Sequence, residues 1–217
     1  MKRRIIHHHL GLGDHIICNG LVRYLIKNNP DTKFTLVCKQ KNIDNVCRMF
    51  NDCDIQYILD NGTEATGNLG WSFGGDRTIN FDEAFYKQAD VDFYERWNSF
   101  YIKRDYFQEK RISYYLQLPS KFALVHDTAS AGSADIEIET DLPIIKMRKT
   151  PVEETMFDWM GVIEKASEIH CINSSFIHLV DSMSPIAKLY FYNDRPHLGF
   201  STKSDWNNIT PNIMEEK

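Results

Sequence analysis

Hydrophobic residues in the first half of this chain fall in short runs that alternate with stretches of helical spacing. The runs end near His9, Cys38 and Leu59, and between them apolar side chains recur every three or four residues. Short runs predict buried strands, and the wider spacing predicts helices that cover them. The expected elements are strands at 4–9, 33–38 and 54–59 and helices at 15–28 and 43–50.

The same alternation restarts after Leu118-Pro119-Ser120. Thr150-Pro151-Val152-Glu153 has the form of a capping box with proline at the first helical position, which predicts a helix start. The expected elements are strands at 122–126, 135–140, 144–147, 168–172 and 186–192, helices at 151–167 and 174–183, and a loop or returning arm after residue 193.

Strand–helix alternation of this kind predicts an α/β fold with parallel sheets and covering helices. We expect two Rossmann-like halves, residues 1–118 and 119–217, with ligands bound in the cleft at the carboxyl ends of the strands. The aromatic stretch from Phe81 to Tyr115 is expected to be mostly core.

Composition narrows the class of protein. The 217 residues are 42% apolar and 25% charged, as in ordinary globular proteins, and the net charge of -5 argues against a nucleic-acid partner. No run approaches the roughly 18 apolar residues of a membrane span, so we expect no integral membrane segment. The five cysteines are odd in number and form no CxxC pair, which favours reduced thiols in a cytoplasmic protein over disulfides or zinc.

The first chemical motif is the strand-turn-helix sequence from His9 to His15. Gly11 and Gly13 would let the backbone approach a ligand, and with His15 they are expected to form a phosphate- or acceptor-binding loop. Ile16 stands where a dinucleotide fingerprint needs a third glycine, which disfavours nicotinamide binding. Asp14 has two interpretations, a helix cap or a general base.

The second motif, residues 173–179, again follows a strand and opens a helix. Asn173, Ser174 and Ser175 offer donors for a diphosphate, and His178 lies one turn further on; the alternative is an Asn173 cap with a packed histidine. Three further sequence features could also bind a nucleotide donor: Asp127-Thr128 after the strand at 122–126, Lys146, and Arg148. The alternative is an ordinary loop for Asp127-Thr128 and solvated surface for the two basic residues. Adjacent histidines at 7–9 cannot all bind one metal, so no metal site is expected.

These two motifs together resemble the signatures of the heptosyltransferase family of GT-B glycosyltransferases. The glycine-Asp turn resembles that of the family's acceptor-side lobe, whose acid is thought to be the catalytic base and falls on Asp14. Residues 173–179 resemble the donor-lobe motif Asp-Ser/Thr-Gly-x-x-His-Leu, with Asn173 in place of the acid and Ser175 in place of the glycine.

The resemblance implies an inverting, metal-independent glycosyltransferase with a compact two-lobed GT-B fold. Its co-substrate would be a nucleotide diphosphate sugar, with no other cofactor. Its acceptor would be a glycan or lipid-linked glycan in cytoplasmic synthesis of a surface glycan. Two alternatives stay open: a non-catalytic binding protein of the same fold, which Asn173 and the short chain favour, and an NAD-dependent oxidoreductase.

Overall fold

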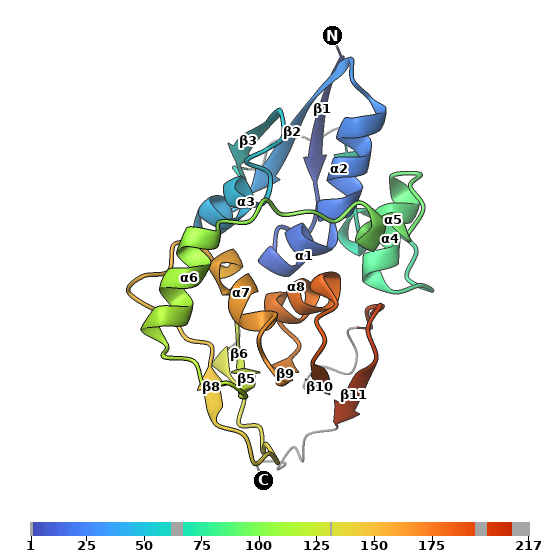
Figure 1. The fold of residues 1–217 in the computed structure, drawn as a ribbon. Coiled ribbons are helices and arrows are strands. Elements are labelled where there is room, and N and C mark those ends of the chain that lie inside the picture. The colour runs from blue at the N-terminus through green and yellow to red at the C-terminus, as the bar shows by residue number, and fades with distance from the viewer. Residues whose placement is uncertain (1, 62–66, 131, 194–198, 210–217) are drawn as a thin grey trace. The chain divides into compact units, whose positions relative to one another are not determined.

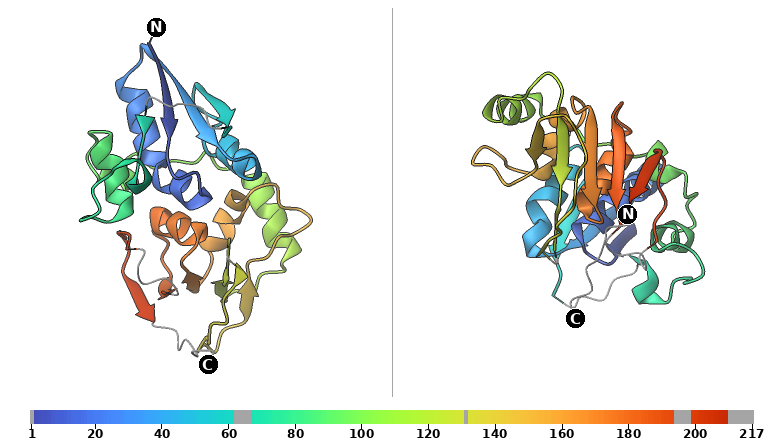
Figure 2. Two further views of the ribbon diagram at one scale, coloured as in Figure 1. Left: turned by 180° about the vertical axis from the view of Figure 1, so that it is seen from behind. Right: turned by 90° about the horizontal axis from the view of Figure 1, so that it is seen from below.

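The computed structural model describes residues 2–61, 67–130, 132–193 and 199–209, and these form two α/β units (Figures 1 and 2). Unit 1 runs to Arg104 and also includes residues 199–201; unit 2 starts at Asp105 and holds the remaining described residues. The division therefore falls before helix α6 (Tyr106–Tyr115), whereas the sequence placed it after residue 118.

The reason for this earlier division is that α6 packs within unit 2. The Lys165 ammonium donates to the Ser113 hydroxyl, and a Cβ on Gly161 would lie 3.0 Å from a carboxylate oxygen of Glu109. Ile112 is fully buried on the inner side of the helix.

Unit 1 contains a four-stranded parallel sheet in the order β3-β2-β1-β4. Apolar side chains of its strands, such as Ile6, Phe34 and Leu36, are buried beneath helices that contribute Ile16 and Leu21. The elements are β1 (Lys2–His7), α1 (Leu12–Ile17), α2 (Asn19–Asn28), β2 (Thr32–Cys38), η1 (Gln40–Asn42), α3 (Ile43–Met49), β3 (Ile55–Leu59), β4 (Gly67–Asn68), η2 (Trp71–Phe73), α4 (Phe81–Gln88) and α5 (Glu95–Asn98).

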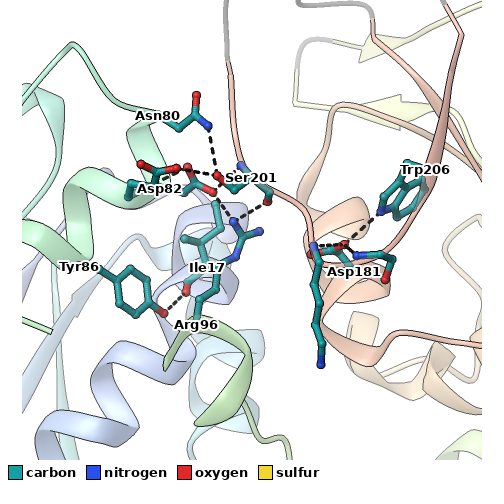
Figure 3. A network of polar contacts seen from close by, with 11 residues as sticks. Ile17, Asn80, Asp82, Tyr86, Arg96, Asp181, Ser201 and Trp206 are labelled. Atoms are coloured by element: carbon teal, nitrogen blue, oxygen red, sulfur yellow. Dashed lines mark hydrogen bonds and ion pairs between the residues drawn. The ribbon is translucent and has the colours of Figure 1, made fainter. Parts of the chain in front are cut away.

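The single helix expected at 15–28 is broken into α1 and α2 at Cys18. The buried Tyr86 hydroxyl donates to the Ile17 carbonyl at 2.7 Å (Figure 3). It also accepts from the Leu21 N–H at 3.1 Å. One hydroxyl from α4 thus satisfies both backbone groups at the break, which removes the cost of leaving them unpaired. No local sequence pattern signals a partner so far along the chain.

Unit 2 contains a five-stranded parallel sheet in the order β11-β10-β9-β5-β8. Its elements are α6, β5 (Ala123–His126), β6 (Thr128–Ala129), β7 (Gly132–Ser133), β8 (Ile144–Lys146), η3 (Met156–Trp159), α7 (Met160–Ile163), β9 (Glu168–Ile172), α8 (Ser175–Met183), β10 (Lys188–Tyr192) and β11 (Trp206–Ile209). The sequence predicts several of these elements at nearly the right place. Examples are the strands at 168–172 and 122–126 and the helix that opens near Ser174.

Two expectations for unit 2 are wrong. Residues 135–140 form no strand, and the helix expected from Pro151 begins only at Met156. The residue that caps the start of this helical segment is Thr155, whose backbone N–H donates to the Asp158 carboxylate at 2.9 Å. Of the two expectations for the tail, a loop or a returning arm, the described part fits the arm, since it contributes β11. Asp181 accepts from the Lys203 and Ser204 N–H groups and holds that stretch beside β10 (Figure 3).

The aromatic stretch is core only in part. Phe85 and Tyr86 are fully buried, but six other aromatic side chains are at least half exposed. These are Tyr94, Tyr101, Tyr106, Phe107, Tyr114 and Tyr115.

Within the described ranges, no helix combines the length and the apolar character that crossing a bilayer requires.

Candidate functional site

The carboxylate of Asp14 sits in the first turn of α1, just after β1 ends. The Gly11 N–H donates to its Oδ2 at 2.9 Å, so Asp14 caps its own helix. A Cβ on Gly11 would lie 2.6 Å from that same oxygen, so only glycine permits this close approach. The positive φ of the turn is at Leu10 (φ 63), whereas Gly11 is extended (φ -71).

The cap interpretation and the base interpretation of Asp14 are therefore compatible, since capping occupies only Oδ2. The side chain is 17% exposed. Burial raises its pKa to about 6, although the Gly11 N–H and the charge of Lys39 act in the opposite direction. A carboxylate with this pKa is ionised at pH 7 and is still a better proton acceptor than an ordinary aspartate.

The remaining residues of the first motif are placed differently from the expectation. The ring of His15 is buried in unit 1, 4.2 Å from the ring of His8 between centroids, and burial lowers its pKa to about 3. His15 therefore does not line a ligand loop. Gly13 is half-buried inside α1, and the Gly11 N–H is already engaged by Asp14. An incoming phosphate would meet that carboxylate, so the turn suits a neutral hydroxyl better than an anion.

The second motif opens α8, and its capping residue is Ser174 rather than Asn173. The Ser174 hydroxyl accepts from the Phe176 N–H at 3.3 Å and is hydrogen-bonded to Nδ1 of His126 at 3.1 Å. Ser175 is the first helical residue and is half-buried, while Asn173 and His178 are buried.

The sequence interpretation missed His126. It ends β5, stacks on Phe176 at 4.8 Å between ring centroids, and has its pKa lowered by burial to about 4. The ring is therefore neutral near pH 7. Its position at the end of the strand that pairs with β9 was the available signal, because the same edge carries Ser174.

Three residues selected separately from the sequence, Asp127, Lys146 and Arg148, come together near the Ser174 cap. Asp127 is buried, and its Oδ2 accepts from Lys146 and from Arg148, each at 3.0 Å, while both basic side chains are about half exposed. Burial raises the pKa of Asp127, but the hydrogen bonds from Arg148 and Lys146 outweigh this effect and bring it below its usual value.

All of these groups lie at one edge of the unit 2 sheet. The strands β8, β5 and β9 are parallel neighbours, with Val125 beside Lys146 and His126 beside Cys171. Their carboxyl ends therefore carry a net positive cluster, the two cations against one carboxylate, next to the N-terminus of α8. Thr128 is adjacent in β6, half-buried and paired with Ser133. This edge has the charge and the donors that a diphosphate requires.

The described part of the chain holds no group of three His, Cys, Asp or Glu side chains arranged to bind a metal ion. Its three adjacent histidines diverge, since His8 is buried against His15 while His7 contacts Phe73.

Comparison with known proteins gives a match at the level of structure. No protein-family model and no curated protein matches the sequence. The crystal structure of the glycosyl transferase family 9 from Veillonella parvula DSM 2008 superposes on 96% of this chain and 86% of that one, with a TM-score of 0.57 and 12% identity. This chain has the fold of that glycosyl transferase. The E. coli heptosyltransferase WaaC with ADP aligns over 97% of this chain and 91% of its own, with a TM-score of 0.48 and 10% identity.

The α/β class with parallel sheets and covering helices is therefore confirmed, and so is the resemblance to a glycosyltransferase, as a likeness of fold.

Proposed function

We propose that this protein is a glycosyltransferase that moves a sugar from a nucleotide diphosphate sugar to a hydroxyl of a glycan or lipid-linked glycan. The observation that carries the proposal is Asp14, a carboxylate with one oxygen engaged by Gly11, the other not used for capping, and a pKa near 6. It lies in a chain with the fold of a glycosyl transferase.

Unit 2 is proposed to hold the donor. Lys146 and Arg148 would neutralise the diphosphate, and the first turn of α8, with Ser174 and Ser175, would supply hydrogen-bond donors. Asp127 now balances one of the two cations, so donor binding would exchange part of its ion pairing for contacts with phosphate.

Unit 1 is proposed to hold the acceptor and to supply the base. Asp14 Oδ1 takes the proton of the acceptor hydroxyl while that oxygen bonds to the anomeric carbon. The bond from this carbon to the diphosphate breaks in the same step, and the nucleoside diphosphate leaves with its electron pair. Direct displacement inverts the anomeric configuration. In this scheme Lys146 and Arg148 balance the leaving charge without a metal.

The free thiols of the five cysteines support a reducing, cytoplasmic setting for this reaction. A surface glycan as product follows only from the resemblance to the heptosyltransferases.

Binding of nucleoside diphosphates tests the donor half of the proposal. UDP, GDP, ADP, CDP and NADH are titrated into the protein by calorimetry. We expect one diphosphate to bind, and Lys146→Met and Arg148→Met each to weaken it about tenfold or more, since a charge-assisted hydrogen bond contributes about 1.5–3 kcal/mol. Lys87→Met, which removes an exposed cation of unit 1 that also pairs with an aspartate, is the matched control and should change nothing. Binding of NADH alone would refute the proposal.

A non-catalytic binding role is favoured by one observation, the uncharged Asn173 at the position of the family acid. It predicts the same binding results but no acceptor-dependent release of nucleoside diphosphate. Asn173→Asp is the informative variant, because it would restore the missing charge.

A further inference from the structure

The imidazole of His9 is held rigidly beside Asp14. Its ring lies 5.0 Å from that of Phe85 in an edge-on contact and is roughly parallel to the ring of Phe81 at 6.5 Å. Behind it, a Cβ on Gly70 would lie 2.4 Å from Nε2, and Gly70 has a positive φ of 106 that also favours glycine. Packing on several sides thus fixes the orientation of this ring.

The hydrogen bonding of His9 fixes its tautomer as well. The Ser72 backbone N–H donates to Nε2 at 3.3 Å, so Nε2 is an acceptor. Burial lowers the pKa of His9, so the ring is neutral near pH 7. A neutral imidazole that accepts at Nε2 carries its proton on Nδ1. The protonated Nδ1 lies 4.0 Å from Oδ1 of Asp14.

We propose that His9 is a positioning residue for Asp14, whose Nδ1–H orients the carboxylate so that Oδ1 is kept ionised and directed for proton abstraction. The inference rests on the proposed function, in which Asp14 is the base. It assigns each carboxylate oxygen a different partner: Gly11 holds Oδ2 in the helix cap, and His9 steers Oδ1.

The separation of 4.0 Å suits this role. It is longer than a hydrogen bond, so the Nδ1–H does not occupy Oδ1, and both lone pairs of this oxygen stay available to the substrate proton. In this inference the N–H dipole favours the charged form of the carboxylate, because little water screens a half-buried pair. A shorter hydrogen bond would hold Oδ1 more firmly but would make it a weaker base.

Within the part of the chain that the structure describes, few other groups act on Asp14. Lys39, after β2, lowers the pKa of Asp14 through its charge, and Cys18, at the end of α1, is a buried thiol whose own pKa is raised by burial and by Asp14. His8 and His15 are buried, and burial lowers the pKa of each, so they carry no charge near pH 7. A change in Asp14 on altering His9 is thus attributable to His9.

The test is an NMR titration of the Asp14 carboxyl carbon in the folded protein, which needs no substrate. His9→Phe keeps an aromatic ring in place and removes both nitrogens. We expect it to raise the pKa of Asp14 by about half a unit or more, since the carboxylate loses a facing N–H dipole. His9→Asn places an amide nitrogen near the former Nδ1 and should reverse part of this rise. His7→Asn, at a neighbouring histidine that contacts Phe73, is the control and should leave it unchanged.

Two results would overturn the proposal. One is an Asp14 pKa that is the same in wild type and in a folded His9→Phe variant. The other, independent of any variant, is a ¹⁵N spectrum of the wild type in which His9 carries its proton on Nε2.

Enzyme kinetics separate this inference from the proposed function. If the wild type transfers sugar, the acidic limb of its kcat/KM profile should move to higher pH in His9→Phe by the same amount as the Asp14 pKa, with the donor KM unchanged. If the NMR shifts appear but no nucleotide sugar is ever turned over, the proposed function fails while the pairing of His9 with Asp14 stands.

Discussion

The backbone of Gly11 and the carboxylate of Asp14 approach so closely that any side chain at position 11 would displace the carboxylate. The Gly11 N–H lies 2.9 Å from Oδ2, and an added Cβ would lie 2.6 Å from the same atom. Gly11 has an ordinary extended backbone, with φ -71 and ψ 152, so its need for glycine comes from Asp14 and not from its own conformation.

Replacement of Gly11 by alanine should therefore displace the Asp14 carboxylate while leaving the fold intact. We expect a loss of about 1 kcal/mol of stability from the lost cap and a fall of about 10²-fold in transfer rate from the misplaced base. The Gly11→Ala/Asp14→Ala double variant is the control. Its stability should equal that of Asp14→Ala alone, since the carboxylate that an alanine Cβ at position 11 would contact is gone. A further loss of stability in the double variant would show that the alanine clashes with a group other than Asp14.

Stability should fall as pH rises from about 4 to about 6. The pKa of Asp14 is about 6 in the folded chain against an ordinary 3.8. Over this interval the folded protein keeps the Asp14 proton and the unfolded chain has lost it, so raising the pH favours unfolding by up to about 3 kcal/mol. Denaturant titrations of wild type and Asp14→Asn across this range measure the effect. A pH slope that is identical in the two proteins would contradict it.

A buried ion pair joins the late segment 199–201 to the rest of unit 1. Asp82 and Arg96 are paired and nearly inaccessible, and Ser201 contacts both, donating its N–H to Asp82 and accepting from Arg96 at its carbonyl, each at 2.8 Å (Figure 3). Asp82→Asn would leave the guanidinium buried without its counter-charge, so we expect a loss of about 3–5 kcal/mol. Asp76→Asn, which breaks an exposed pair with Lys87, is the control and should have no measurable effect. Equal effects of the two substitutions would refute this account.

A second buried carboxylate should control the last strand of unit 2. Asp181 accepts from the backbone of Lys203 and Ser204 and from the Trp206 indole N–H, at 3.0–3.1 Å. Asp181→Asn weakens these charge-assisted bonds, each worth about 1.5–3 kcal/mol. Amides of β11 should then exchange with solvent about ten- to a hundredfold faster, while those of β9 keep their protection. Unchanged amide exchange in β11 would show that its pairing with β10 alone keeps this strand in the sheet, without Asp181.

Sequence periodicity predicts most of the strands, because each is a short apolar run flanked by polar residues. The strand Glu168–Ile172 and the helix that opens after it are examples. Periodicity fails where a distant group decides the local structure. The break at Cys18 depends on Tyr86, and β11, in a polar stretch, depends on Asp181.

The candidate site likewise contains residues that local sequence patterns identify and residues whose role depends on distant contacts. Motif spacing identifies Asp14 and Ser174, and the strand-end rule identifies Asp127, Lys146 and Arg148, which the fold brings together. His9 is not distinguished by any local motif, and the one sequence signal for His126 is its place at the end of the predicted strand 122–126. Their significance comes from pairing across the fold, with Asp14 and with Ser174, which requires coordinates. The burial of His15 likewise depends on tertiary packing against His8.

The central claim, sugar transfer with Asp14 as base, is tested most directly by acceptor-dependent release of nucleoside diphosphate. Wild type and Asp14→Asn are incubated with the nucleotide sugar whose diphosphate binds, with and without a surface-glycan acceptor preparation. We predict release that requires the acceptor and falls by about 10²-fold or more in Asp14→Asn, with unchanged binding of the diphosphate. Release that is equal in the two proteins would contradict the account.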